Sequence, residues 1–170
     1  MSVEIGIEVY GLKEAIKSLN SVEPGLRNEI TRDYRRLAKP VIQDAKRLIP
    51  KVAPLSGMER NWTSKSGKQL MPWLADHKQP LKASINTRKI SEFRGMVRNV
   101  GTFVIRWGGP LPVMFDSSTN GKLGRSLTQE YGKASRVMWP ALEKKETQVM
   151  AELTTLVEKV MDKVNRNVVM

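Results

Sequence analysis

The sequence predicts an α+β fold, in which a small mixed or antiparallel β-sheet packs against a long kinked helix and a long C-terminal helix. Three observations lead to this prediction. The first residues alternate between apolar and other side chains, which is the period of a half-buried strand. Residues 26–48, and later the residues after 139, carry apolar side chains at steps of three and four, the period of a helix that buries one face.

The N-terminal strand is expected over residues 3–10, where valine and isoleucine alternate with glutamate, glycine and tyrosine. Gly11 ends this alternation. The next residues change to helical spacing, so we expect a short amphipathic helix over residues 12–20. Its apolar side is expected to consist of Leu12, Ala15, Ile16 and Leu19.

The longest periodic segment, residues 23–50, predicts a long basic helix. Pro40 lies inside the pattern, where proline removes a backbone hydrogen bond and crowds the preceding turn. The apolar stripe keeps its phase across Pro40, which predicts one kinked helix, ended by Pro50, rather than two helices. The stripe can serve a core or a subunit interface equally well, and it consists of Leu26, Ile30, Tyr34, Leu37, Ala38, Val41, Ile42, Ala45 and Leu48.

Residues 51–80 have no period and are rich in lysine, serine, glycine and proline, so we expect a functional or disordered loop within a single domain of 1–170. Two segments with strand character follow, at 82–90 and 93–109. In the second, Phe103, Ile105 and Trp107 are expected to share one face. Residues 116–124 are expected to form another loop, with a tight turn at Asn120-Gly121.

The closing segment contains the dipeptide Trp139-Pro140. A residue before proline is pushed towards extended geometry, and proline is favoured at the first position of a helix. We therefore expect Trp139 to be the last extended residue, wedged between the helix and the sheet as a core residue, with a ligand role as the alternative. The helix is expected to begin at Pro140 and to bury Leu142, Val149, Leu153, Leu156, Val157, Val160, Met161 and Val164.

The composition is that of one folded domain of 170 residues without cysteine, which excludes disulfides, thiolate metal sites and cysteine nucleophiles. The N-terminus carries acidic residues and does not resemble a signal peptide. No uncharged apolar stretch is long enough to cross a bilayer. We therefore expect no membrane partner, and a place in a cytosol-like compartment or in an assembly built there.

The net charge of +12 is concentrated in the middle of the chain, where residues 51–108 hold 11 basic and 3 acidic residues. This excess predicts a surface that meets phosphate or an acidic partner. The alternative is a solvated basic segment that serves solubility, because no groove-reading motif accompanies the charge. The candidate DNA-facing or partner-facing residues are Lys65, Lys68, Lys78, Lys82, Arg88, Lys89, Arg94 and Arg98.

Catalytic patterns are weak, and we expect no enzyme activity, no cofactor and no metal site. His77 is the only histidine, and its combination with Ser66 and Asp76 lacks a nucleophile-elbow pattern. Glu59 and Asp116 are scattered acids. The segment GKLGRS, residues 121–126, lacks the preceding strand and the ending of a phosphate-binding loop.

Three motifs, in order along the chain, resemble those of the tail-component family of long-tailed bacteriophages, the neck or tail-completion proteins. Members have a Gly-Leu helix start near the N-terminus, an Ala-x-Pro-Val/Ile-x-x-x-Ala-Lys helix and a late Pro-Ala-Leu helix start. The matching residues are Gly11-Leu12, Ala38–Lys46 and Pro140-Ala141-Leu142. Residues 134–141 are similar to a subset from phages of high-GC Gram-positive hosts. The resemblance spans most of the chain and is weakest over 51–130.

The resemblance implies a non-enzymatic α+β virion subunit at the head–tail junction, assembled in the host cytoplasm. Its first implied partner is itself, as a homo-oligomeric ring with a hexamer as the expected size. The further partners are head–tail connector, tail terminator or tail tube proteins, and the genomic DNA that passes through. The alternative functions are a stand-alone nucleic-acid-binding protein and, more remotely, a small hydrolase.

Overall fold

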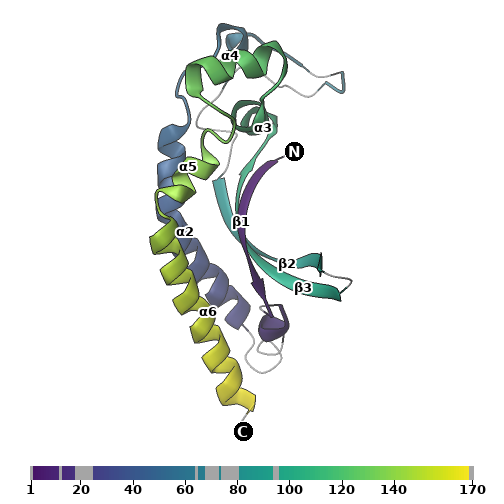
Figure 1. Cartoon of the computed structure of the whole chain (residues 1–170), viewed down its shortest axis with the longest axis vertical. Helices are drawn as coiled ribbons and strands as arrows, with labels where there is room; N and C mark the ends of the chain where they lie inside the picture. Colours follow the sequence, from purple (N-terminus) through teal and green to yellow (C-terminus); the bar gives the residue numbers. More distant parts are fainter. Residues whose placement is uncertain are drawn as a thin grey trace. The chain divides into compact units, whose positions relative to one another are not determined.

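A computed structural model describes residues 2–11, 13–17, 25–63, 65–67, 73, 81–93 and 96–168. It confirms the α+β class, because the described residues contain a three-stranded antiparallel sheet together with helices. The strand order is β1-β3-β2 (Figure 1). The elements are β1 (Ser2–Tyr10), α2 (Leu26–Leu48), η1 (Ser56–Glu59), β2 (Leu81–Phe93), β3 (Met96–Gly108), α3 (Pro110–Ser117), α4 (Gly121–Tyr131), α5 (Met138–Glu143) and α6 (Glu146–Val168).

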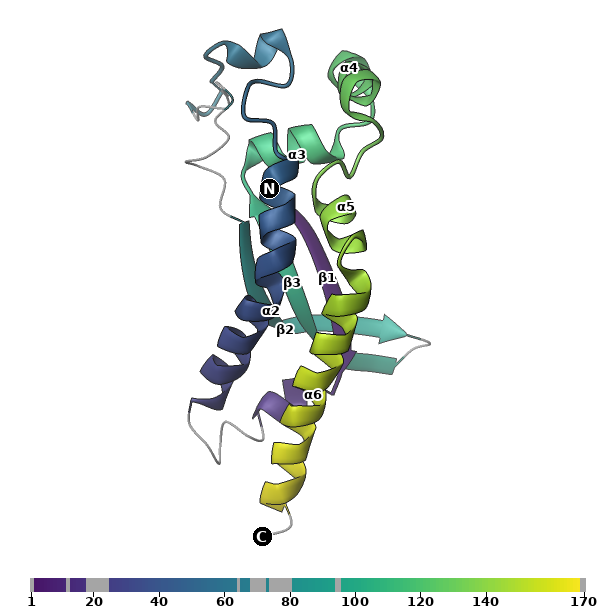
Figure 2. The same cartoon turned by 90° about the vertical axis from the view of Figure 1, so that its left-hand side faces the viewer.

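The chain packs as two compact units. The first unit comprises Met1–Ile5, Val41–Lys82 and Arg106–Lys144. The second comprises Gly6–Pro40, Ala83–Ile105 and Lys145–Met170. Helix α2 and the three strands contribute residues to both units. Within the second unit, α2 and α6 run side by side along one face of the sheet (Figure 2).

Strand β1 confirms the alternation expected at the N-terminus, since residues 3, 5, 7 and 9 are half-buried and the residues between them are exposed. Gly6 has no room for a side chain, because a Cβ there would lie 3.0 Å from the carbonyl oxygen of Phe103. Gly11 follows with a φ of 75°, a backbone conformation that favours glycine. Residues 13–17 are helical and bury Ala15 and Ile16, as predicted, whereas Leu12 and Leu19 lie outside the described residues.

Helix α2 is a single helix with Pro40 inside it, as the unbroken phase of the stripe predicted. Its stripe forms much of the core. The buried members are Ile30, Tyr34, Leu37, Ala38, Val41 and Ala45. One prediction at the end of the stripe was wrong: Leu48 is exposed and Ile49 is buried instead. The helix ends at Leu48, and the chain bends at Ile49 so that the side chain of Ile49 takes the buried position.

Strands β2 and β3 confirm the two predicted β segments. Strand β3 lies between its neighbours, and Phe103, Ile105 and Trp107, which were expected to share one face, are all buried. Thr102 and Val104, which precede and follow Phe103, are buried as well. Burial therefore extends to both faces of the strand at its centre. In the second unit the ring of Phe103 packs on Tyr34 of α2, with 4.7 Å between the centroids.

The loop predicted over residues 116–124 was wrong. Helix α3 ends at Ser117 and α4 begins at Gly121, so the connection is three residues long. Asn120-Gly121 forms the start of α4 instead of a hairpin turn, with Asn120 as the cap residue. Gly124 is needed there, because a Cβ at this position would lie 2.5 Å from the backbone carbon of Thr119.

The C-terminal region also differs from the expected single helix that begins at Pro140. Helix α5 begins at Met138 and ends at Glu143, and α6 begins at Glu146. Trp139 is therefore helical, and 54% of its surface is exposed, so the predicted wedge is wrong. Pro140 is tolerated within α5 because the first N–H groups of a helix have no intrahelical acceptor.

The face expected for the C-terminal helix is only partly buried. Val149, Leu153, Leu156 and Val160 are buried as expected. Leu142 and Val157 are half-buried, and Met161 is exposed. The side chain of Val164 lies outside the described residues.

Candidate functional site

The basic residues singled out in the sequence are brought together only in part. Lys65 and Lys82 are exposed in the first unit. Arg88, Lys89 and Arg98 belong to the β2–β3 hairpin, and their side chains lie outside the described residues. Lys68, Lys78 and Arg94 lie outside the described residues altogether. The structure therefore places a basic hairpin and two exposed lysines, and it does not define a closed basic site.

The described part of residues 51–80 has more structure than a solvated loop. Met58 in η1 and Trp73 are buried. The backbone N–H of Trp73 donates to the carbonyl of Met58 at 2.9 Å, and its indole Nε1 donates to the carbonyl of Pro50 at 2.8 Å. The ring of Trp73 also packs edge-on against Phe115. Trp62, by contrast, is 57% exposed.

The residues weighed for catalysis do not form a described site. Ser66 is exposed, and Asp76 and His77 lie outside the described residues. No group of three potential metal ligands occurs among the described side chains. Of the scattered acids, Glu59 is exposed, but Asp116 is buried and has a defined role in the packing.

Asp116 lies in the last turn of α3 and fixes the start of α5. Its Oδ1 atom accepts hydrogen bonds from the backbone N–H groups of Val137 at 2.6 Å and Met138 at 3.4 Å. Its backbone carbonyl accepts a third bond from the N–H of Ser135 at 2.6 Å. The carboxylate thus satisfies N–H groups at the start of α5 that have no acceptor within the helix. This remote cap explains why α5 begins at Met138 and not at Pro140.

Arg136 is buried beside this cap and ties three elements of the first unit together. Its guanidinium donates to the carbonyls of Phe115 at 2.6 Å, Gly132 at 2.9 Å and Ser118 at 3.1 Å, and to Thr128 Oγ1 at 3.1 Å. These acceptors come from the end of α3, from α4 and from the loop after α4. The planar fork of an arginine suits several acceptors around one point.

Burial governs the electrostatics of this cluster. Burial raises the pKa of Asp116, and the hydrogen bonds from the backbone N–H groups together with the charge of Arg136 act in the opposite direction. Burial also lowers the pKa of Arg136, against the effect of Asp116. Oδ2 of Asp116 has no hydrogen-bond partner among the described residues. Sequence reasoning missed both residues, because neither belongs to a local motif and their partners lie four to 22 positions away.

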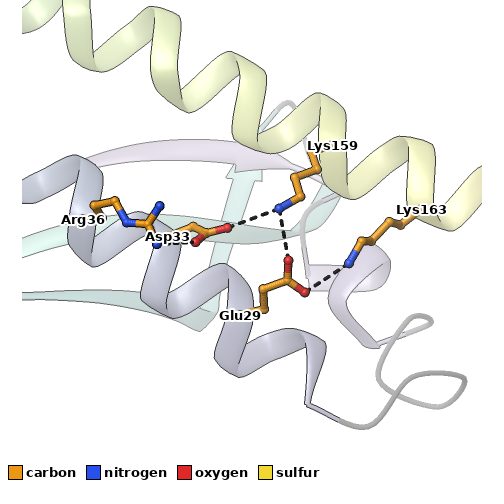
Figure 3. Close-up of polar contacts among 5 residues, drawn as sticks. All are labelled: Glu29, Asp33, Arg36, Lys159 and Lys163. Atoms are coloured by element: carbon orange, nitrogen blue, oxygen red, sulfur yellow. Dashed lines mark hydrogen bonds and ion pairs between the residues drawn. The ribbon is translucent and has the colours of Figure 1, made fainter.

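A second polar cluster joins α2 and α6 in the second unit (Figure 3). Lys159 contacts Glu29 at 3.0 Å and Asp33 at 3.4 Å, and Lys163 contacts Glu29 at 3.1 Å. Asp33 also pairs with Arg36 on its own helix. These contacts lower the pKa of Glu29 and raise the pKa of Lys159, in both cases chiefly through the hydrogen bonds between them. The cluster therefore holds the C-terminal helix on α2 through ion pairs.

Two hollows border α6 in the second unit. The smaller, of about 230 Å³, is lined by residues of α2 and α6 that include Asp33 and Glu152. The larger, of about 410 Å³, is lined by the polar side of α6: Thr155, Glu158, Lys159, Asp162, Lys163 and Arg166.

Large apolar side chains remain exposed in the first unit. Their exposed fractions range from 38% to 74%, and the residues are Leu48, Val52, Trp62, Tyr131 and Trp139. The ring of Tyr131 packs edge-on against Phe115, and this contact covers part of the Tyr131 side chain. Scattered exposed apolar residues are common on proteins, but two half-exposed tryptophans are a typical feature of contact surfaces.

No protein-family model, curated protein or solved structure matches this chain. Among the described helices, none is both long enough and apolar enough to span a membrane.

Proposed function

We propose that this chain is a non-enzymatic structural subunit of the head–tail junction of a long-tailed bacteriophage, where it forms a ring that completes or joins the tail. The observation that carries the proposal is the order of the three motifs that resemble the tail-component family. These are Gly11-Leu12, the segment Ala38–Lys46, and Pro140-Ala141-Leu142.

The physical roles of the motif residues support this assignment. Gly11 has a positive φ at the end of β1. Ala38 and Ala45 are each 1% exposed on the buried face of α2, and Ala141 is fully buried in α5. Positions of this kind admit only glycine or a small side chain, because a larger one would overpack the core. The motif residues therefore lie at positions where the fold admits few residue types. A resemblance between structural subunits is expected at such positions.

The surface of the described residues supports a role in assembly. The buried polar residues Asp116 and Arg136 are used within the fold, and Glu29 and Asp33 of α2 pair with lysines of α6. Exposed tryptophans remain available for contact with neighbours. In the proposed ring these neighbours are further copies of the chain, expected to number six, and connector, tail terminator or tail tube proteins.

The basic middle of the chain suits the same location. Genomic DNA passes through the head–tail junction, and the net charge of +8 over residues 51–108 would face either this DNA or an acidic neighbouring ring.

The test is electron microscopy of negatively stained particles from a phage that carries a stop codon early in this gene. We expect full heads and free tails that fail to join, and joined particles when the wild-type chain is supplied from a plasmid. Heads without any tails would place the chain in tube assembly instead of at the joint. Normal joined and infectious particles would refute the proposal.

A stand-alone nucleic-acid-binding protein is the second candidate, favoured by the net charge of +12. Such a protein would bind duplex DNA as an isolated chain. The logarithm of its binding constant would fall linearly with the logarithm of the salt concentration, with a slope set by several phosphate contacts. Concentration-dependent ring formation without DNA affinity would exclude it.

A further inference from the structure

Helix α2 presents three arginines to solvent on adjacent turns within the second unit. Arg32, Arg35 and Arg36 are all exposed, and we call them the arginine face. Arg35 and Arg36 follow Arg32 at steps of three and four, the spacing that places side chains on one side of a helix. The apolar residues of the same stretch, 30–38, are all buried, so the arginine face includes no exposed apolar side chain.

The acids of this part of α2 are engaged mainly with α6. Glu29 contacts Lys159 at 3.0 Å and Lys163 at 3.1 Å, and Asp33 contacts Lys159 at 3.4 Å (Figure 3). Arg36 lies 3.7 Å from Asp33, and 76% of the Arg36 side chain is exposed. An exposed ion pair of this length contributes little to stability, so the guanidinium of Arg36 stays accessible.

The arginine face keeps most of its positive charge. Arg32 and Arg35 have no ion pair with any residue that the structure describes. Like charges three and four positions apart repel one another and destabilise a helix. The arginine face therefore lowers the stability of α2. A face that serves only solubility needs no such crowding, because acids and bases that alternate along a helix face are also well solvated.

The chemistry of the arginine face fits phosphate better than it fits a protein surface. The centre of a protein–protein interface is normally apolar and poor in charged residues. The exposed side chains of the arginine face provide no such apolar centre and no aromatic anchor. Phosphate groups require only positive charge and hydrogen-bond donors, and the planar guanidinium of arginine can donate two parallel hydrogen bonds to one phosphate.

We propose that the arginine face of α2 binds the phosphate backbone of duplex DNA. From Arg32 to Arg36 the helix rises by about 6 Å. A duplex carries one negative charge per about 1.7 Å of its axis, so the face meets about three phosphates. Contacts of this kind carry no sequence information. The inference goes beyond the proposed function, because it assigns a DNA contact to α2, outside the basic middle of the chain, and it applies to a ring subunit and to a stand-alone DNA-binding protein alike.

The test is a DNA-binding titration of the full chain that carries Arg32→Gln, Arg35→Gln and Arg36→Gln. Fluorescence anisotropy measures the binding to two labelled duplexes of unrelated sequence over a series of salt concentrations. We expect this triple variant to bind both duplexes about tenfold more weakly or worse at low salt. The slope of the logarithm of the binding constant against the logarithm of the salt concentration is expected to become shallower by about 2.7, because each of three phosphate contacts contributes about 0.9.

A matched control separates this contact from the effect of net charge. Arg106→Gln, Arg125→Gln and Arg166→Gln remove three exposed arginines from β3, α4 and α6. As in the arginine face, one of the three, Arg106, belongs to an exposed ion pair. We expect the control to keep the wild-type slope. Urea denaturation checks folding, and the triple variant of α2 is expected to be at least as stable as the wild type, because it relieves the repulsion along the helix.

The outcomes separate this inference from its alternatives. Wild-type affinity and slope in the triple variant would overturn it, and so would an equal loss in the control, which would assign the binding to total charge. A wild-type chain without affinity for duplex DNA at low salt would also overturn it. A triple variant that binds DNA normally but loses self-association would assign the arginine face to a neighbouring copy and overturn the DNA contact. Particle morphology tests the head–tail proposal independently, so either proposal can fail while the other holds.

Discussion

Asp116 shows how one buried carboxylate can determine where a helix begins. The residue before a proline is normally extended, which predicts a helix start at Pro140. In the structure, Oδ1 of Asp116 accepts hydrogen bonds from the backbone N–H groups of Val137 and Met138. The helix therefore begins two residues earlier, and Trp139 is exposed. The guanidinium of Arg136 donates to the carbonyls of Phe115 and Ser118, on either side of Asp116 in the sequence.

We predict that Asp116→Ala lowers the free energy of unfolding by about 2–3 kcal/mol, because it leaves two buried N–H groups without an acceptor and removes side-chain packing. Asp116→Asn keeps an acceptor oxygen and is expected to cost less. Urea denaturation of both variants measures the difference, with Glu130→Ala as the exposed control on α4. Equal stability of Asp116→Ala and the wild type would contradict the proposed cap.

The pH dependence gives a second readout for Asp116→Asn. Burial raises the pKa of Asp116 above its usual value near 3.8, so the folded state holds this proton more tightly than the unfolded state does. The contribution of Asp116 to stability is therefore fully present below pH 3.8 and is lost as the pH rises through the raised pKa. Relative to Asp116→Asn, the wild type should gain stability as the pH falls from neutral.

The elements that periodicity alone determines were predictable from the sequence. Strand β1 and helix α2 each bury one dominant face, and the spacing of Val3 to Val9 or of Ile30 to Ala45 reports that face directly. Helices α3 and α4 were missed, since prolines at 110 and 112 and glycines at 121 and 124 read as loop signals. Gly124 is required by the approach of Thr119, and such a contact is not visible in the sequence.

The candidate site could be predicted less well than the fold. The charge excess of residues 51–108 is a property of composition, whereas the partners of Arg136 are fixed by the tertiary structure. The spacing of apolar residues in a sequence also cannot tell whether a helix face packs within its own chain or against a neighbouring chain. Val160 and Met161 of α6 were both expected on the apolar face of this helix, whereas the first is buried and the second is exposed.

The ion-pair cluster allows a prediction for helix α6 as an element. Glu29→Gln removes the acid that binds both Lys159 and Lys163, and we expect it to lower the free energy of unfolding by about 0.5–1 kcal/mol, because these are partly exposed pairs. The effect should shrink as salt is added. Thermal unfolding at low and high salt measures it, with Glu130→Gln as a control without this pair.

The sign of the pH effect follows from the two shifted groups. The pKa of Glu29 is lowered from its usual value near 4.5, so its contribution is present above that pH and is lost as the pH falls through the lowered pKa. The pKa of Lys159 is raised from 10.5, so its contribution is present below that pH and is lost as the pH rises through the raised pKa. The difference in the free energy of unfolding between Glu29→Gln and the wild type should therefore be constant near neutral pH and disappear in acid. A difference that persists at pH 2 would contradict the assignment.

At the scale of the whole molecule, the distribution of charge is the property that separates the proposed functions. A ring subunit needs a local charge match between copies, because copies with a net charge of +12 repel one another at long range. A stand-alone DNA-binding protein needs the excess of basic residues to form one continuous surface on the isolated chain. A segment that faces a DNA channel needs such a surface only after the particle has assembled.

The basic middle segment tests this distinction in the particle. We predict that changing Lys65, Lys68, Lys78 and Lys82 to glutamate impairs head–tail joining or DNA retention and leaves the fold intact, because reversing four charges turns an attraction for phosphate or an acidic neighbour into a repulsion. Particle yield and infectivity after complementation with the variant measure the first effect, and circular dichroism of the purified chain measures the second. The matched control reverses Lys39, Lys46, Lys122 and Lys133, which are exposed on α2, on α4 and in the loop after α4, and changes the net charge by the same amount. Yield and infectivity that fall equally in both variants would assign the effect to total charge, and values unchanged in the first variant would remove this segment from the joint.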